Sequence, residues 1–472
     1  MRKTKIVCTI GPVSNSPEIL EQLMRAGMNV ARLNFSHGTL EDHGKTINKI
    51  RRIADELDRP VAILQDLAGP KIRIGEIKDG PITLEPEATF TITNRDVPGD
   101  ESEVSVNYHD LPRDVNSGDT LLLSDGALEM EVIETNDQDV KCRVIVGGTL
   151  NSRKGITLTT GTISAPIMSD KDRSDLAFGI EQGVDYVAIS FVRNAKDVLE
   201  VRKFMEERGS VIPLIAKIEK HEALQNIDEI IKVVDGIMVA RGDLGVETPL
   251  EKIPRVQKML IEKANQASKP AIAATQMLLS MVNSPRPTRA EVTDVANAIF
   301  DGASGVMLSE ESAAGKYPVK AVEIMSKIAE DAESGFNYDV WIQRLGVKNL
   351  KDRPDEGVSL GARNLAENIQ AGYIVTFTHS GSTARLVSKY RPRQSILAVT
   401  PMEETYRRLA LIWGVIPILV ESAKDIDDMM DKAHTAVLNS GLVKRGETVV
   451  ITAGIPVGEP GKTNLINVRV VK

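Results

Sequence analysis

The chain has 472 residues, enough for roughly two to four domains, and its 42% hydrophobic and 26% charged residues are ordinary for a soluble globular protein. A net charge of −8 argues against a general nucleic-acid binder. No apolar stretch approaches the ~18 residues of a membrane span, and no secretory signal is recognisable. The distant cysteines Cys8 and Cys142 fit free buried thiols. We therefore expect a cytoplasmic protein without nucleic-acid or membrane partners.

The first part of the chain alternates between strands and helices. Strands are predicted at residues 4–10, 29–35 and 61–67, where short apolar or β-branched runs end in polar or turn residues. Ser16-Pro17 starts the first helix, as an N-cap followed by proline at the first helical position, and a charged helix is predicted over 41–57. This alternation is typical of an α/β fold.

Between residues 71 and 166 the alternation stops. The segments there are short and strand-like, and turn signals such as Asp79-Gly80 and Gly147-Gly148 separate them. No helix of useful length can be placed. The pattern predicts a small inserted β-barrel domain, with a β-sandwich as the alternative, and Pro70 and Pro166 stand at its two entry points as hinge residues.

After residue 166 the alternation resumes and completes a set of eight strands. The remaining five are predicted at 185–192, 214–219, 236–241, 271–277 and 305–308, and the helices at 171–181, 195–208, 221–233, 249–268, 288–300 and 317–332. Eight strand–helix units indicate a TIM barrel, (β/α)8, with the β domain inserted after its third strand. A doubly wound open sheet is the alternative. The count of eight, and polar residues at the C-terminal end of each strand, favour the barrel.

A break is predicted at residues 337–355, and a C-terminal α/β domain follows. Its strands are predicted at 373–378, 396–399, 415–420, 448–452 and 465–470, with helices at 357–369, 382–390, 403–411 and 426–440. The expected domains are a catalytic barrel at 1–70 and 167–336, a lid at 71–166, and a C-terminal domain at 355–472.

Lys217 and Glu219 stand two residues apart near the end of a buried strand, so they share one face. A structural ion pair is the simplest explanation of such a spacing. However, the next strand leads to Asp243, which adds a second carboxylate at the equivalent end of the barrel. A lysine between two carboxylates suits a divalent cation beside a phosphate or enolate, and this composition favours phosphoryl transfer. No P-loop or protein-kinase motif is present.

At this point the sequence resembles the pyruvate kinase family over essentially its whole length. The matching segments keep the family's order and are long and specific: Lys5–Pro12 (KIVCTIGP), Met28–Gly38 (MNVARLNFSHG), Ile215–Glu219 (IAKIE), Met238–Glu247 (MVARGDLGVE), Ala274–Met277 (ATQM) and Pro285–Glu291 (PRPTRAE).

The resemblance implies transfer of phosphate from phosphoenolpyruvate to ADP, giving pyruvate and ATP in the last step of glycolysis. It implies that Lys217 stabilises the transferring phosphoryl group, and that Glu219 and Asp243 hold Mg²⁺, with Mn²⁺ as an alternative. Thr275 would help protonate the enolate. The other implied contacts are Arg32 to phosphate, Ala240, Arg241 and Gly242 to the substrate carboxylate, and Asn34, His37 and Arg73 to the nucleotide, a structural histidine being the alternative for His37.

The resemblance also implies a monovalent-cation cage of Asn34, Ser36, Asp66 and the Leu67 carbonyl. Here the sequence departs from the family, because Asp66–Arg73 reads DLAGPKIR where potassium-dependent members read DTKGPEIR. Lys71 replaces the glutamate, and its ammonium group would supply the charge that potassium otherwise brings, so we predict that K⁺ is not required. A solvated hinge lysine is the alternative. Glu310 and Ala314 also depart from the family, which usually has Gly and often Lys there.

A second candidate site follows the first strand of the C-terminal domain. Thr376–Thr383 runs into a helix and offers hydroxyls and backbone N–H groups to a phosphate, although ordinary N-capping explains most such loops. In the resembling family this loop binds an allosteric sugar phosphate. The proposed contacts are Thr378, Ser380, Gly381, Ser382 and Thr383; fructose bisphosphate, a sugar monophosphate and AMP all stay open. The resemblance further implies a homotetramer.

Two other functional classes stay open from the sequence. A catalytically inactive paralogue would only bind ligand, although Lys217, Glu219, Asp243 and Thr275 are all present. A TIM-barrel lyase or aldolase acting on an enolate with Mg²⁺ is the second, and the inserted and C-terminal domains disfavour it.

Overall fold

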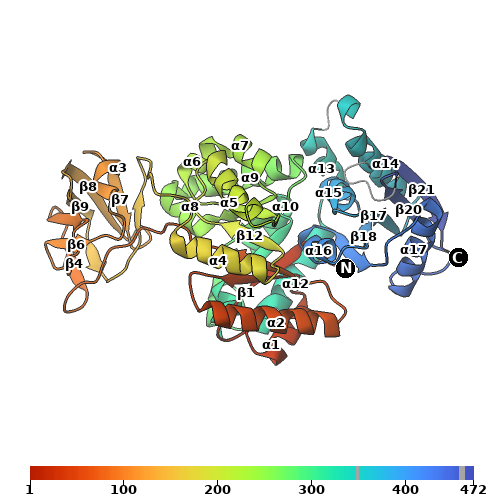
Figure 1. Ribbon diagram of the computed structural model, residues 1–472, viewed down its shortest axis with the longest axis horizontal. Helices are drawn as coiled ribbons and strands as arrows, with labels where there is room; N and C mark the ends of the chain where they lie inside the picture. The colour runs from red at the N-terminus through yellow and green to blue at the C-terminus, as the bar shows by residue number, and fades with distance from the viewer. Residues whose placement is uncertain (347–349, 457–462, 472) are drawn as a thin grey trace.

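The structure, a computed structural model, describes residues 1–346, 350–456 and 463–471. Three units lie in a row, with the inserted β unit at one end, an α/β barrel in the middle and a C-terminal α/β unit at the other end (Figure 1). The N-terminal segment lies where the barrel and the C-terminal unit meet, and the Lys3 carbonyl accepts a hydrogen bond from the Gly414 N–H. None of the helices in the described residues is long and apolar enough to cross a membrane.

Eight parallel strands close into a barrel, as predicted. They are hydrogen-bonded in the order β1-β16-β15-β14-β13-β12-β3-β2, and the ring closes between β2 and β1. The strands are β1 (Lys5–Ile10), β2 (Val30–Asn34), β3 (Ala62–Asp66), β12 (Tyr186–Ile189), β13 (Leu214–Ile218), β14 (Gly236–Ala240), β15 (Ala271–Ala274) and β16 (Gly305–Leu308). The open-sheet alternative is therefore excluded.

Helices surround this barrel. They are α1 (Pro17–Ala26), α2 (Leu40–Glu56), α4 (Asp170–Glu181), α5 (Ala195–Glu206), α6 (His221–Gln225), α7 (Ile227–Val233), α8 (Arg241–Glu247), α9 (Ile253–Gln266), α10 (Arg289–Phe300), α11 (Glu310–Ala313) and α12 (Pro318–Ser334), with 3-10 turns η1 (Leu250–Lys252) and η2 (Leu279–Val282). Ser16 and Thr288 cap α1 and α10 through their side chains.

Two helix predictions in this region are wrong. The helix predicted over 221–233 is divided at Asn226, whose side-chain amide donates to the Arg193 carbonyl (3.0 Å) in the loop after β12. Residues Arg241–Glu247 form α8, a short helix directly after β14, where the sequence predicted no helix. Two glycines in seven residues give that segment low helix propensity, so its tertiary contacts decide its conformation.

The barrel strands carry two apolar cores because successive side chains alternate between its faces. The inner core contains Val7, Ile215 and Met238, together with residues of the other strands. Their neighbours, such as Ile6 and Ile237, belong to a larger core between the barrel and the helices. This alternation decides which polar side chains reach the mouth of the barrel.

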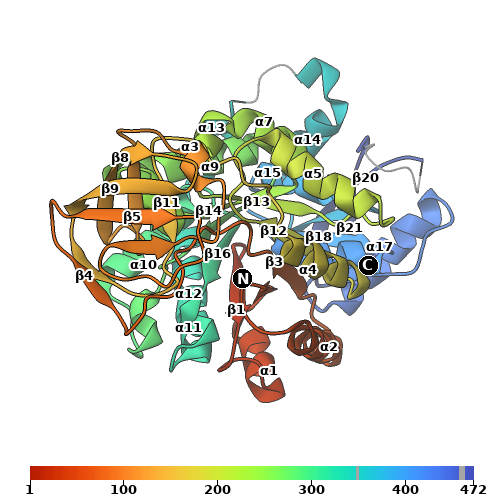
Figure 2. The ribbon, with the colours of Figure 1, turned by 60° about the vertical axis from the view of Figure 1, so that its left-hand side comes forward.

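The inserted unit is all-β apart from one short helix. Its elements are β4 (Ile82–Leu84), β5 (Thr89–Thr93), β6 (Glu103–Ser105), α3 (Leu111–Asp114), β7 (Thr120–Leu123), β8 (Leu128–Thr135), β9 (Asp139–Val146), β10 (Gly148–Leu150) and β11 (Ile156–Leu158). In Figure 2 this unit comes forward, and β5, β8 and β9 run side by side. The strands form a six-stranded sheet, β11-β7-β8-β9-β5-β6, and a two-stranded sheet, β10-β4, around one apolar core. Residues 72–75 connect the two edges of the six-stranded sheet, because Arg73 bridges to Gly155 beside β11 and Ile74 bridges to Val106 beside β6. Hydrogen bonding therefore continues around the unit, as in the predicted small barrel.

The C-terminal unit has a five-stranded sheet in the order β19-β18-β17-β20-β21, with only β21 antiparallel. Its elements are α13 (Tyr338–Leu345), η3 (Leu350–Asp352), α14 (Pro354–Asn368), β17 (Tyr373–Phe377), α15 (Ser382–Lys389), β18 (Ser395–Thr400), α16 (Glu403–Arg408), η4 (Leu409–Leu411), β19 (Val415–Leu419), α17 (Ile426–Asn439), β20 (Thr448–Ala453) and β21 (Leu465–Val470).

The break predicted at 337–355 contains helix α13. Asn337 caps it, Gly346 ends it with a left-handed conformation (φ 57°), and Tyr338, Trp341 and Leu345 are buried at helical spacing. Two turns of helix are too short for the periodicity to identify, which explains the error. Residues 347–349 of this break, and 457–462 and 472 of the predicted C-terminal domain, lie outside the described residues.

Candidate active site at the mouth of the barrel

Strand alternation brings the predicted polar residues to the inner face of the barrel mouth. Ile215 of β13 belongs to the inner core, so Lys217 and Glu219 face the same way. Counting from Leu64 in β3 places Asp66 there in the same manner. Counting in the same way from Val30 in β2 gives Arg32 and Asn34, and counting from Ala188 in β12 gives Ser190.

Lys217 lies at the centre of a buried polar network. Its Nζ is 2.9 Å from Glu219 Oε1 and 3.5 Å from Asp66 Oδ1, and it donates to Ser190 Oγ (2.8 Å). The Ser190 hydroxyl in turn donates to the Leu67 carbonyl (2.7 Å). The three charged side chains are 13%, 1% and 2% exposed, so their charges are screened little by solvent.

Arg32 adds a second cation to this network. Its Nε donates to Asp66 Oδ2 (2.6 Å), and one terminal nitrogen donates to Thr9 Oγ1 (2.8 Å). Asp66 thus lies between Arg32 and Lys217, and it orients both cations toward the mouth. The network therefore contains one acid, Asp66, that contacts two cations, and a second acid, Glu219, that contacts Lys217.

The pKa directions distinguish the two acids. Burial raises the pKa of Asp66, but the charges of Lys217 and Arg32 outweigh it and hold that pKa below its usual value. Burial raises the pKa of Glu219, Asp243 raises it further, and Lys217 only partly offsets them. For Lys217, burial lowers the pKa, but Asp66 and Glu219 reverse the shift and raise it. Of these two carboxylates, Glu219 is therefore the one whose negative charge is less fully compensated by nearby positive charge.

Asp243 lies in the first turn of α8, which directly follows β14, the strand that neighbours β13. The ammonium group of Lys71 is 4.0 Å from Asp243 Oδ1, and both side chains are partly exposed. Gly155 of the inserted unit lies beside the Lys71 side chain, where an added Cβ would come within 3.3 Å of its Cε. The hinge lysine thus reaches over the acidic end of β14 from the side of the inserted unit.

Thr275 follows β15, and alternation from Ile272 would point it away from the inner face. Positive φ angles at Thr275 (66°) and Gln276 (54°) turn the chain there. The Thr275 hydroxyl accepts a hydrogen bond from the Gly242 N–H (2.9 Å) and donates to the Ala274 carbonyl (2.6 Å). These hydrogen bonds hold Thr275, which follows β15, against the start of α8, which follows β14.

Arg241 has a different position from the other cations. Its guanidinium donates to the carbonyls of Ala274 (3.1 Å) and Thr275 (2.6 Å) and pairs with Asp294 (2.6 Å). The side chain holds β14 and β15 together. Its guanidinium is therefore committed to these structural contacts.

The four predicted cage residues do not all have free ligand atoms. Asn34 Oδ1 accepts the Ser36 N–H (3.1 Å), Asp66 is paired as described, and the Leu67 carbonyl accepts from Ser190. Among the described residues, the ion pairs and hydrogen bonds of the Lys71 side chain include Asp243 and none of these four. The structure places Lys71 beside the predicted metal ligands, not inside the cage.

The predicted nucleotide contacts lie at the edge of the mouth. His37 is exposed, and its carbonyl accepts from His43 Nε2 (2.8 Å). Arg73 is exposed and donates to the Arg153 carbonyl (3.0 Å) within the inserted unit. Glu310 and Ala314 are both exposed, at and just after α11.

A pocket opens between the barrel mouth and the inserted unit. Glu219, Asp243 and Lys71 line it, together with Asp125, Ile156 and Thr157 of the inserted unit and Arg193, Lys220 and Glu247 of the barrel. The sequence does not predict that Asp125 and Thr157 line this pocket, since no strand-end rule assigns functional positions in an inserted β unit. Lys220 and Glu247 were not predicted to line it either, although Lys220 directly follows the segment IAKIE and Glu247 ends the segment MVARGDLGVE.

The candidate effector loop joins β17 to α15. Gly381 has a left-handed conformation (φ 81°), and the Arg385 guanidinium donates to the Ser380 carbonyl (3.1 Å). Ser380 is exposed, and its hydroxyl donates to that of Ser382 (3.3 Å). Two further predicted contacts, Thr378 and Thr383, are buried, and the Thr383 hydroxyl is paired with that of Thr463 (2.9 Å).

Comparisons with known proteins agree along the whole chain. Residues 1–322 match the family model "Pyruvate kinase, barrel domain", and residues 356–469 match "Pyruvate kinase, alpha/beta domain". The chain is 48% identical over 474 residues to a pyruvate kinase of Geobacillus stearothermophilus and 46% identical over 473 residues to one of Staphylococcus epidermidis. These alignments cover 100% of this chain and 80% and 81% of those proteins. The crystal structure of a pyruvate kinase from Cryptosporidium parvum superposes with a TM-score of 0.94 at 40% identity, covering 100% of this chain and 96% of the other.

Proposed function

Because the chain belongs to the pyruvate kinase family and is a phosphotransferase, we propose that it transfers the phosphoryl group of phosphoenolpyruvate to ADP and forms pyruvate and ATP. The observation that carries this proposal is the buried Lys217, which lies between Asp66 and Glu219 at the mouth of the barrel. In the reaction, an oxygen of the ADP β-phosphate bonds to phosphorus while the bond from phosphorus to the enol oxygen breaks. The enolate that is released takes up a proton at carbon.

Lys217 and Arg32 supply the fixed positive charge for this transfer. Asp66 holds both cations, and the raised pKa of Lys217 keeps its ammonium group charged throughout the neutral range. Charge on the transferring phosphoryl group spreads over its peripheral oxygens, so preoriented cations stabilise it without rearranging during the reaction. Positioning and charge neutralisation are the main work of these residues.

Glu219 and Asp243 fit the coordination of a divalent cation. Both offer carboxylate oxygens, which Mg²⁺ prefers, and the undercompensated Glu219 carboxylate would gain from a cation beside it. Bound there, Mg²⁺ or Mn²⁺ supplies neutralisation of substrate and nucleotide oxygens. A second Mg²⁺ would arrive with the nucleotide.

Thr275 and the start of α8 act on the remainder of the substrate. The backbone of Ala240 to Gly242 would contact the substrate carboxylate. The hydrogen bond from the Gly242 N–H to the Thr275 hydroxyl fixes the position of this backbone relative to Thr275. That hydroxyl would assist proton delivery to the enolate carbon, through water. Asn34, His37 and Arg73 would contact the nucleotide, and the inserted unit, residues 71–166, would act as a lid that excludes water.

We expect activity without potassium. Lys71 brings a permanent positive charge to the acidic end of β14, and Arg32 and Lys217 already compensate Asp66 in the cage. In a sodium-free buffer, a potassium titration should change kcat by less than about twofold, whereas Lys71→Glu should introduce a dependence on potassium. Steady-state rates of pyruvate formation measure both.

Strong activation of the wild-type protein by potassium would contradict this expectation. Lys78→Glu provides a matched control, because it makes the same charge change on an exposed lysine of the inserted unit. It should leave the response to potassium as it is in the wild type.

We further propose that the loop after β17 binds a phosphorylated effector, a sugar phosphate or AMP, through Ser380, Gly381 and Ser382. The exposure of Ser380, the partial exposure of Ser382 and the backbone N–H groups at the start of α15 support this assignment. Thr378 and Thr383 support the loop from below, since both are buried. The C-terminal unit, residues 355–472, would carry this site and contribute to a cytoplasmic homotetramer.

Substitution of the loop hydroxyls should remove regulation and keep basal activity. Ser382→Ala is expected to weaken the response to the activating phosphate ester by at least about tenfold, because hydrogen bonds to charged groups are worth ~1.5–3 kcal/mol. Thr383→Ala should act less strongly, since its hydroxyl contacts Thr463. Activation curves with fructose bisphosphate, a sugar monophosphate and AMP measure the effect. Curves that stay unchanged in both variants would count against the site.

The assay that tests the main proposal is pyruvate formation from phosphoenolpyruvate with and without ADP. A phosphotransferase requires ADP, a lyase or aldolase acts without it, and an inactive paralogue forms no pyruvate in either case.

A further inference from the structure

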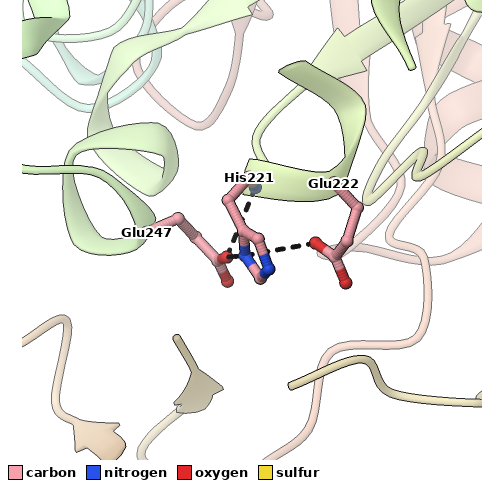
Figure 3. Close-up of side chains that lie close together, drawn as sticks. All are labelled: His221, Glu222 and Glu247. Carbon is pink, nitrogen blue, oxygen red and sulfur yellow. Dashed lines mark hydrogen bonds and ion pairs between the residues drawn. The ribbon is translucent and has the colours of Figure 1, made fainter. Parts of the chain in front are cut away.

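A second group of ligand atoms lies one helical turn from the proposed metal ligands. His221 and Glu222 begin α6, two and three residues after Glu219, and Glu247 ends α8, four residues after Asp243. Figure 3 shows the three side chains converging from these two helices. One ligand atom from each, a ring nitrogen and two carboxylate oxygens, lies within 4.8 Å of the others.

The imidazole lies between the two carboxylates. His221 Nδ1 is 2.8 Å from Glu247 Oε2 and 3.3 Å from Glu222 Oε2 (Figure 3). Lys220 Nζ pairs with the other oxygen of Glu247. The Glu247 side chain is only 3% exposed, whereas that of His221 is 23% exposed, so the group is enclosed on one side and open on the other.

Glu222 is the unexplained member of this group. The residue is 8% exposed, and both of its carboxylate oxygens are buried without a hydrogen bond among the described residues. His221 Nδ1, 3.3 Å from Oε2, makes no hydrogen bond to it and pairs with its charge only if the imidazole is protonated. Arg193 is close enough for the Glu222 charge to raise its pKa, but its guanidinium donates to both oxygens of Asp197 and to the Ile163 carbonyl and not to Glu222. A buried carboxylate without a partner is costly, and such groups are normally paired or coordinate a metal.

The charges of the cluster favour a cation. With a neutral imidazole, Glu222, Glu247 and Lys220 sum to one negative charge in a mostly buried volume. One imidazole nitrogen with two carboxylates is a ligand set suited to Zn²⁺ and related transition ions, whereas Mg²⁺ prefers oxygen ligands alone. Glu247 also lines the pocket at the barrel mouth, which gives an ion a route to the cluster.

We propose that His221, Glu222 and Glu247 form a second divalent-cation site, selective for a transition ion of the Zn²⁺ type and distinct from the site at Glu219 and Asp243. It goes beyond the proposed function, because it requires only binding and holds whether or not the chain transfers phosphate. An ion there would join α6 to α8, the helix that carries Asp243.

The test is a Zn²⁺ titration of the full chain after metal removal by a chelator and dialysis. Excess Mg²⁺ is kept present, so that the oxygen-ligand site is filled. The wild type is expected to retain one Zn²⁺ per chain. Loss of a residue that only orients a metal ligand typically lowers metal affinity about 10–100-fold. Glu222→Gln and His221→Gln each remove a direct ligand, so each should weaken Zn²⁺ binding by at least about 100-fold. Calorimetry and elemental analysis after dialysis measure affinity and stoichiometry.

Two controls separate this site from others. His434→Gln removes a histidine of α17, outside the barrel, and should leave Zn²⁺ binding unchanged. Asp243→Asn should also retain it, and loss of Zn²⁺ in that variant would place the ion at the other site and overturn the proposal. Equal binding by the wild type and Glu222→Gln, or no binding by the wild type, would overturn it as well.

A measurement on the wild type alone covers the case in which the variants fail to fold. X-ray absorption at the zinc edge should show one imidazole and oxygen ligands around the ion. A coordination shell without imidazole would contradict the assignment.

Discussion

Replacing Lys217 with methionine is expected to lower kcat for pyruvate formation by about 10³-fold. Removing a single preoriented donor to a developing negative charge typically costs about 10²–10³ in rate, and Lys217 is the cation that contacts both Asp66 and Glu219. The variant also leaves Glu219 without its 2.9 Å cation partner. Because breaking a buried ion pair costs about 3–5 kcal/mol, the variant should also be less stable than the wild type.

The stability loss must be separated from the catalytic loss. Lys389→Met makes the same substitution in a buried ion pair of the C-terminal unit, where Lys389 Nζ is 3.0 Å from Glu356. That control should show a comparable loss of free energy of unfolding in denaturant melts and keep kcat within about tenfold. If Lys217→Met also keeps kcat within tenfold while folded, Lys217 has no role at the phosphoryl group.

The second large effect is expected from Glu219→Gln. The variant removes one carboxylate from the pair that Glu219 forms with Asp243, so it should require at least about 100-fold more Mg²⁺ for half-maximal activity. A ligand that binds only the folded state raises stability by RT ln(1 + [L]/Kd), so added Mg²⁺ should raise the Tm of the wild type and leave that of the variant nearly unchanged. Activity and thermal melts across a Mg²⁺ series measure both results.

Glu200→Gln is the matched control for this variant. Glu200 is an exposed carboxylate on α5 that pairs with Arg173 on the outside of the barrel. It should have the Mg²⁺ dependence of the wild type. A Glu219→Gln variant with that same dependence would show that Glu219 does not hold the ion.

The barrel could be predicted because its signals are local and repeated. Each of its strands is a short apolar run, and alternation by two residues brings Lys217, Glu219 and Asp66 to one face without any tertiary information. Lys217 and Glu219 share that face, and Lys217 Nζ is 2.9 Å from Glu219 Oε1. The contact between Lys217 and Asp66 depends on the register between β3 and β12, which the periodicity of the sequence does not reveal.

Other features depend on contacts that a sequence pattern does not contain. Helix α8 has low intrinsic propensity, Thr275 reaches the mouth through a left-handed backbone, and Asn226 divides α6 from α7 through a contact with the loop after β12. Lys71 was expected beside the monovalent-cation cage, but its position beside Asp243 follows from how the inserted unit approaches the barrel. Tertiary packing, not local preference, sets each of these positions.

The central proposal is phosphoryl transfer between two bound substrates at Lys217, and following the phosphoryl group tests it most directly. With phosphoenolpyruvate labelled on phosphorus, together with ADP and Mg²⁺, the label should appear in the γ-phosphate of ATP in equal amount to pyruvate. Label released as inorganic phosphate, or pyruvate formed without ATP, would contradict the account.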